Sequence, residues 1–222
     1  MPVEVLYEDN HIIAINKKAG DIVQGDKTGD TPLSEKVKEY IKEKYNKPGN
    51  VFCGVPHRLD RPVTGVILFT KTSKALERLN KMFQNKKIQK TYWALTVEPP
   101  FPADAHLTHY LVKNRNKNIT KAHEKPVKDG LKSELIYSYV KEKKGMYLVE
   151  VNPLTGRPHQ IRVQLSSVGA SIKGDLKYGA NFPNKDKSIC LHARHIEFEH
   201  PIKKEMIKIS APTPNKNGWE LF

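Results

Sequence analysis

The chain has 222 residues, of which 38 are lysine or arginine and 24 are aspartate or glutamate, so its formal net charge is +14. It lacks an apolar run near the roughly 20 residues that a membrane span needs, and its N-terminus lacks the long apolar region of a secretion signal. The sequence therefore gives no support for membrane insertion or export, and the excess of positive charge favours nucleic acid as the partner. Cys53 and Cys190 are the only cysteines, as expected for the reducing cytoplasm.

The first half of the chain predicts strands and helices that alternate irregularly. Apolar residues surround an Asp-Asn turn in a pattern typical of a β-hairpin, and two later stretches have apolar residues at helical spacing. In chain order we expect hairpin strands over Val3–Tyr7 and Ile12–Asn16, a helix over Thr31–Tyr45, a strand over Val66–Thr70 and a helix over Ser73–Gln84.

The second half predicts more strands and one further helix. A lysine-rich stretch that is poor in apolar residues, 113–132, is interpreted as a mobile loop or a basic arm. The irregular order of elements favours an α+β fold with a mixed, largely antiparallel central sheet flanked by helices. The expected elements are strands over Tyr92–Val97, Leu135–Val140, Met146–Val151, Ile196–Phe198 and Met206–Ile209, and a helix over His159–Val168.

One acidic residue, Asp60, lies between Arg58 and Arg61 just before the apolar strand VILFT. The two guanidinium groups favour the charged form of the carboxylate, which suits a nucleophile or a base. Thr64-Gly65 allows a tight turn or the close approach of a ligand backbone. The alternative is a surface cluster of ion pairs, and local charge alone favours that alternative.

A second cluster lies in LTGRPHQIRVQL, 154–165. On a helix, Arg162 shares a face with His159, and Arg157 precedes the first turn, where backbone amides attract anions. The alternative is a capped amphipathic helix that is partly in the core, and one helix can satisfy both interpretations.

Two further features leave alternatives open. Tyr92 follows Lys87 and Lys90, and an aromatic ring among lysines suits stacking on a nucleic-acid base, although a core or edge position is also compatible. Cysteine and histidine side chains offer zinc ligands, but the short Cys-x2–4-Cys pairing of zinc sites is absent. The candidate zinc ligands are Cys53, His57, Cys190 and His192.

Five segments in this order resemble the RluA-type family of RNA pseudouridine synthases. They are LYEDNHIIAINKKAG, HRLDRPVTG, KIQKTYWAL, LTGRPHQIRVQLSSVGASIKGDLKYG and LHARHIEFEHP, and together they extend over nearly the whole chain. The resemblance implies the pseudouridine synthase fold, with two lobes around a basic catalytic cleft. It also implies that residues 1–222 form one catalytic domain without the small N-terminal RNA-binding module of many relatives.

The resemblance also assigns roles to residues. Asp60 would be the catalytic aspartate, Tyr92 the tyrosine that stacks on the target base, and Arg162 the partner of the catalytic carboxylate. Arg58 would enter the RNA helix as the target uridine leaves it, and Arg61 keeps the salt-bridge interpretation. The predicted RNA-binding residues are Arg58, Lys90, Arg157, His159 and Gln160.

The implied reaction converts a uridine of structured RNA, ribosomal or transfer RNA, into pseudouridine. It involves neither redox change nor net hydrolysis, so we expect no cofactor and no metal. We also expect a cytoplasmic monomer without an obligatory protein partner. The alternatives are a non-catalytic RNA-binding or RNA-folding protein on the same scaffold, and a metal-dependent nuclease, which would need clustered acids that this sequence lacks.

Overall fold

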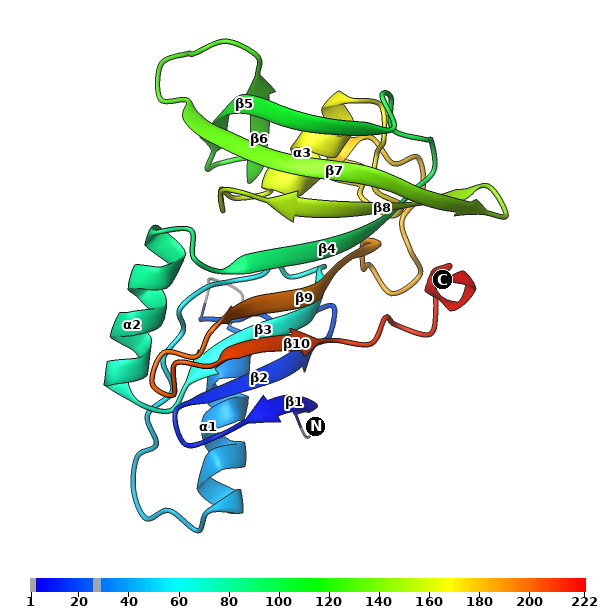
Figure 1. Cartoon of the computed structure of the whole chain (residues 1–222). Coiled ribbons are helices and arrows are strands. Elements are labelled where there is room, and N and C mark those ends of the chain that lie inside the picture. The colour runs from blue at the N-terminus through cyan, green and yellow to red at the C-terminus, as the bar shows by residue number, and fades with distance from the viewer. Residues whose placement is uncertain (1–2, 26–28) are drawn as a thin grey trace. The chain divides into compact units, whose positions relative to one another are not determined.

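The computed structural model describes residues 3–25 and 29–222, and the chain forms two compact units (Figure 1). The first unit comprises the chain up to Gln89 together with Ala193–Pro212, and the second comprises Lys90–His192 together with Thr213–Phe222. Each unit combines a largely antiparallel sheet with helices, which confirms the predicted α+β class. Within the described ranges, no helix is long and apolar enough to cross a membrane.

In the first unit the strand order is β1-β2-β3-β9, and β10 pairs with β9. In Figure 1 the orange and red strands β9 and β10 complete a sheet that begins with the blue and cyan strands. The structure confirms the predicted hairpin, both helices and the closing strands. The elements are β1 (Val5–Glu8), β2 (Ile12–Lys17), α1 (Leu33–Lys44), β3 (Thr64–Thr70), α2 (Ser73–Gln84), β9 (Leu191–Glu199) and β10 (Met206–Ser210).

Both faces of this sheet are buried. Ile12 and Leu68 belong to a core cluster with Leu79 of α2, and their neighbours on the opposite face, Ile13 and Phe69, are 0% exposed. Successive side chains of a strand point to opposite faces, so a strand covered on both sides has a continuous apolar sequence. This explains the run VILF in β3, which ends the segment that carries Asp60.

In the second unit the strand order is β4-β8-β7-β5-β6. Helix α3 packs with β5 and β6 around a small cluster of Leu111, Val163 and Tyr178. Helix α3 begins at Gln160, one residue after the predicted start, because His159 has a left-handed backbone with φ 56°. The elements are β4 (Gln89–Thr96), β5 (Asp104–Asn114), β6 (Ile119–His123), β7 (Leu131–Lys143), β8 (Met146–Pro153), α3 (Gln160–Ser167) and the 3-10 helices η1 (Leu176–Tyr178) and η2 (Trp219–Leu221).

The prediction of a loop or arm over 113–132 is wrong for much of that stretch. It contains the end of β5, all of β6 and the start of β7. β6 pairs with β5 from Ile119 to His123, and the backbone N–H of Thr120 donates to the hydroxyl of Tyr178 at 2.8 Å. Backbone pairing and a few apolar contacts fix this strand, although its composition is polar, because tertiary context outweighs composition in short strands.

Candidate active site

The segment that carries Asp60 is an irregular loop between α1 and β3. Leu59 is buried, Arg58 is exposed and Asp60 is half-buried. The carbonyl of Asp60 accepts a hydrogen bond from the backbone N–H of Val63 at 3.1 Å, so Asp60 opens a tight turn. We call residues 60–63 the Asp60 turn. His57 fastens the loop before this turn, because its Nε2 accepts from the Leu68 N–H at 2.9 Å and its ring stacks on Phe83.

A buried amine, that of Lys17, donates hydrogen bonds to the backbone of the Asp60 turn. Lys17 is 1% exposed, and its Nζ donates to the carbonyls of Val63 at 2.7 Å, Arg61 at 3.1 Å and Lys18 at 3.1 Å. Burial lowers the pKa of Lys17 to about 8, although the charge of Asp60 acts in the opposite direction. Two of the three acceptors belong to the turn itself. Lys17 therefore fixes the backbone on which Asp60 stands, and sequence reasoning assigned it no role.

Gly65 follows the turn and differs from its expected role. Its φ is +111°, and an added Cβ would lie 2.3 Å from the carbonyl oxygen of Ala193. The close approach that this glycine permits is therefore that of the β9 backbone, not of a ligand. Nearby, the salt-bridge interpretation of Arg61 is confirmed, because its guanidinium pairs with Asp30 at the surface.

In the second unit, Arg162 lies at the centre of a buried cluster. Arg162 is 5% exposed and Asp175 is 1% exposed. The Nε of Arg162 donates to Oδ2 of Asp175 at 2.6 Å, and its Nη2 donates to Oδ1 at 2.8 Å. The guanidinium carbon lies 5.0 Å from the ring centroid of Tyr178. A bidentate pair with an aromatic ring beside it fixes both the position and the plane of the guanidinium.

Tyr178 also connects the start of α3 to β6. Its hydroxyl lies 2.7 Å from Nδ1 of His159 and accepts from the backbone of Thr120. His159 and Arg162 thus contact the same tyrosine, although His159 precedes the helix and the expected i, i+3 relation on one helix face does not apply to it. Asp175 and Tyr178 both belong to the segment GDLKYG, but sequence reasoning gave them no role, because no periodicity relates η1 to α3.

The remaining predicted RNA-binding residues of this unit differ in exposure. Gln160 is buried, and its amide group bonds Thr155, the Arg157 N–H and the Glu134 carbonyl at 2.7–3.0 Å. Arg157 is exposed. Gln160 therefore shapes the loop that presents Arg157, and direct RNA contacts of His159 and Gln160 stay predictions.

Strand β4 carries Lys90 and Tyr92. Tyr92 pairs with Val151 of β8 and is half-buried, at the point where the strand passes from exposed residues to the buried Ala94. Burial lowers the pKa of Lys90, whose Nζ lies 3.9 Å from the place that a Cβ on Gly156 would take. Lys90 and the loop before α3 thus lie together, and a partly exposed ring at Tyr92 is compatible with stacking.

The two cysteines do not form a competing site. Burial raises the pKa of Cys53 to about 12 and that of Cys190 to about 11, so both thiols stay protonated at neutral pH. In the described part of the chain, no three histidine, cysteine or acidic side chains are grouped to hold a metal ion.

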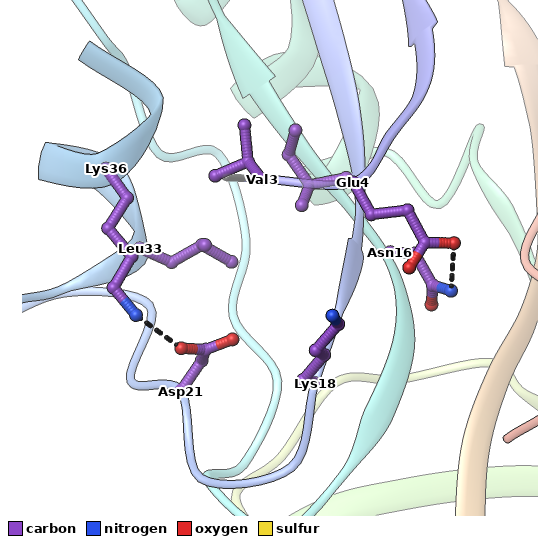
Figure 2. Close-up of a pocket in the computed structure, with 8 residues that line it drawn as sticks. Val3, Glu4, Asn16, Lys18, Asp21, Leu33 and Lys36 are labelled. Atoms are coloured by element: carbon purple, nitrogen blue, oxygen red, sulfur yellow. Dashed lines mark hydrogen bonds and ion pairs between the residues drawn. The ribbon is translucent and has the colours of Figure 1, made fainter. Parts of the chain in front are cut away.

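A pocket of about 40 Å³ opens in the first unit between β2 and α1. Figure 2 shows Lys36 reaching Asp21 and Asn16 reaching Glu4 at its rim, with N···O distances of 2.7 and 3.0 Å. These bonds occupy four of its polar side chains. Its lining includes none of the predicted site residues: Val3, Glu4, Ile15, Asn16, Lys18, Asp21, Leu33 and Lys36.

The fold agrees with comparisons with known proteins. A family model described as RNA pseudouridylate synthase matches residues 11–167, a range that includes Asp60, Tyr92 and Arg162. The chain belongs to the RNA pseudouridylate synthase family.

Two curated relatives illustrate the similarity. The chain is 34% identical over 220 residues to "Ribosomal large subunit pseudouridine synthase C" of Buchnera aphidicola subsp. Schizaphis graminum, with 94% of this chain and 66% of the relative covered. It is 31% identical over 228 residues to "tRNA pseudouridine synthase C" of Pasteurella multocida, with 95% and 91% covered. The chain thus spans slightly less than two thirds of the ribosomal relative's length.

Solved structures show the same fold. "Human RNA Pseudouridylate Synthase Domain Containing 4" superposes with a TM-score of 0.80 at 22% identity, covering 95% of this chain and 88% of that one. "Human RNA Pseudouridylate Synthase Domain Containing 1" gives a TM-score of 0.75 at 19% identity, covering 98% and 86%. Together they confirm the predicted fold class.

Proposed function

We propose that this protein isomerises a uridine in structured RNA to pseudouridine, as an intramolecular transferase, and that the two units make up one catalytic domain over 1–222. The observation that carries the proposal is the family match over 11–167, which spans Asp60, Tyr92 and Arg162. The names of the two relatives, a ribosomal large subunit synthase and a tRNA synthase, support ribosomal or transfer RNA as the substrate. We further propose a cytoplasmic monomer that needs no protein partner.

Three residues carry the proposed reaction. Asp60 is the catalytic carboxylate, Arg162 is its partner, and Tyr92 stacks on the target base. Local geometry supports these roles, because Lys17 fixes the Asp60 turn and Asp175 fixes the plane of the Arg162 guanidinium. Preorganised groups of this kind lower a reaction barrier because they need not reorient as charge develops.

The chemistry is balanced without any co-reactant. The N1–C1′ bond breaks, the uracil turns, and a C5–C1′ bond forms while the hydrogen on C5 passes to solvent and N1 acquires one. A uridine in structured RNA must first leave its stack, which costs a few kcal/mol. Stacking on Tyr92 and phosphate contacts of a chain with net charge +14 offset that cost. Arg58, Lys90, Arg157, His159 and Gln160 are the proposed RNA-binding residues.

The test is Asp60→Asn. RNA labelled with tritium at uridine C5 is transcribed, and tritium release to water measures turnover, while filter binding measures affinity. We expect turnover to vanish and RNA affinity to change less than about threefold. Asp129→Asn, at an exposed acid of the second unit, is the matched control and should keep full activity.

Full tritium release by Asp60→Asn contradicts the proposed catalytic role. Pseudouridine mapping of total RNA from cells with and without the gene then identifies the modified uridine. If the maps are identical and Asp60→Asn sustains cellular function, the non-catalytic RNA-binding interpretation replaces the proposal.

A further inference from the structure

An exposed aromatic ring, that of Phe182, lies on a loop that the proposed reaction does not use. We call residues 179–188 the Phe182 loop. Phe182 is 80% exposed, whereas Tyr178, four residues earlier, is 6% exposed. A single exposed apolar side chain is common on protein surfaces, so exposure alone does not indicate a binding role for Phe182. The anchoring and the positive charge of this loop are the observations that indicate one.

The Phe182 loop is fastened on both sides of the ring. Before it, the Ala180 N–H donates to the Asp175 carbonyl at 3.1 Å. After it, the buried Asn184 donates from Nδ2 to the Ser188 carbonyl at 3.0 Å. Asp186 accepts from the Ser188 hydroxyl at 2.6 Å and pairs with a lysine near the C-terminus of the chain. A ring on an anchored loop loses little conformational entropy when it binds.

The surroundings of Phe182 are basic. Lys177, Lys185 and Lys187 are exposed within five residues of Phe182 along the chain, and the one acid in residues 177–188, Asp186, is already paired with Lys216 at 2.6 Å. Exposed lysines beside an aromatic ring form the combination that binds single-stranded nucleic acid, because the amines hold phosphates and the ring stacks on a base. Lys177 already donates to the Asn118 carbonyl at 3.3 Å, so Lys185 and Lys187 are the amines best placed to bind phosphate, and this positive charge favours an anionic partner over an apolar protein surface.

The loop also continues directly from the residues that hold Arg162. Asp175 binds Arg162 and Tyr178 lies against it, and only four peptide units separate Tyr178 from Phe182, a span of at most about 14 Å. If the target uridine reacts near Arg162, as the proposed function requires, the neighbouring nucleotides of the same RNA are within reach of the ring.

We propose that Phe182 stacks on an unpaired base of the RNA substrate, outside the target uridine, and that Lys185 and Lys187 hold the adjoining phosphates. This inference rests on the proposed function for the identity of the RNA, but its binding step does not depend on turnover. Phe182 is thus a determinant of substrate affinity, not a catalytic residue.

The experiment measures binding of a fluorescein-labelled 12-nucleotide oligouridylate to the full chain. Phe182→Ala should weaken binding about 5- to 100-fold, the fold-change that corresponds to loss of one base–aromatic stack. Phe182→Trp should bind as the parent does, and its additional tryptophan fluorescence should be quenched by the oligouridylate. Thermal melting of each variant confirms folding, which an 80% exposed side chain does not control.

Phe101→Ala is the matched control. Phe101 is 87% exposed in the same unit, but Glu98 and Asp104 flank it, so it should not attract phosphate. The salt dependence of binding distinguishes the contribution of the ring from that of the lysines. Phe182→Ala should leave the slope of log K against log salt unchanged, whereas Lys185→Gln should reduce the magnitude of this slope by about 0.7. In turnover assays Phe182→Ala should raise KM and leave kcat within about twofold.

Equal oligouridylate affinity of Phe182→Ala and the parent overturns the inference, as does an equal loss in Phe101→Ala. An unchanged affinity together with altered oligomerisation of Phe182→Ala would assign the ring to a protein contact instead. Failure of the proposed function would be seen separately, as an absence of tritium release by the parent protein while its oligouridylate binding persists.

Discussion

Asp175 binds Arg162 through both carboxylate oxygens, at 2.6 Å to Nε and 2.8 Å to Nη2, with both side chains buried. Removing one member of a buried pair leaves the other charge without compensation, and this costs about 3–5 kcal/mol. The orientation of Arg162 thus depends on a residue that need not touch the substrate. Asp175 is therefore a positioning residue for the proposed reaction.

Asp175→Asn should lower the free energy of unfolding by about 3 kcal/mol and reduce kcat more than it raises KM. The amide keeps the shape of the side chain but loses the charge. Urea unfolding measures stability, and tritium release measures turnover. Asp129→Asn is the exposed control, and a kcat that is unchanged in Asp175→Asn after correction for the folded fraction would contradict the positioning role.

Tyr178 allows its hydroxyl and its ring to be tested separately. Tyr178→Phe removes the acceptor of the Thr120 N–H and leaves a buried donor without its partner, at a cost of about 1–3 kcal/mol, while the ring beside Arg162 remains. We therefore expect Tyr178→Phe to lose stability with nearly normal kcat, and Tyr178→Leu to lose both. Urea unfolding measures the stability of both variants, and single-turnover kinetics measures their catalytic rates. Equal kcat values for Tyr178→Phe and Tyr178→Leu would show that turnover does not need the ring.

The sequence predicts elements that local interactions stabilise better than elements that depend on residues distant along the chain. Helix α2 has the predicted bounds because its cap and its apolar spacing are local, and Thr72 accepts from the Ala75 N–H as a cap should. β6 was missed because its stability comes from pairing with β5 and from Tyr178, which lies far along the chain. The pair of Asp175 and Arg162 was not predicted for a similar reason, since the chain between α3 and η1 must fold back before the two side chains meet.

Lys17 is a different case, because the sequence contained a usable signal. Alternation in β2 points Ile13, Ile15 and Lys17 to one face, so the lysine continues a buried set. A pair of adjacent lysines is normally interpreted as surface, and Lys18 is indeed exposed. The burial of the Lys17 amine is explained by the carbonyls of Arg61 and Val63 that accept its hydrogen bonds, and only the structure shows these.

The pKa of Lys17, about 8 in the folded chain, predicts a pH dependence of stability. The unfolded chain keeps this proton up to about pH 10.4, so between pH 8 and 10.4 it binds more protons than the folded chain. The contribution of Lys17 to the free energy of unfolding should therefore rise by about 2 kcal/mol from pH 7.5 to 9.5.

Lys17→Met should abolish this rise, and Lys18→Met should keep it. Urea unfolding of both variants and the parent at the two pH values measures the difference, in which the titration of tyrosines and cysteines cancels. Lys17→Met should also reduce turnover, because the carbonyls of Arg61 and Val63 lose their donor. Parallel pH curves for parent and Lys17→Met would contradict the assignment.

Glu8 fastens α1 to the first hairpin and predicts behaviour at acid pH. Burial alone would raise the pKa of Glu8, but hydrogen bonds from Lys44, Lys71, Tyr45 and Tyr40 outweigh it and lower the pKa to about 2. The folded carboxylate thus stays ionised where the unfolded one is protonated. Its contribution, about 3 kcal/mol, is fully present above pH 4.5 and is lost as the pH falls toward 2.

Glu8→Gln should therefore destabilise the chain at pH 7 by about 3 kcal/mol and flatten the acid limb of the stability curve. Glu39→Gln, on the same helix as Tyr40 but exposed, should change stability by less than about 0.5 kcal/mol. Urea unfolding at pH 7, 4.5 and 3 compares the three proteins. The free energies of unfolding of Glu8→Gln and the parent should converge at low pH, because protonation removes from the parent the same charge that the substitution removes. A difference between them that stays constant with pH would assign the lost stability to packing instead.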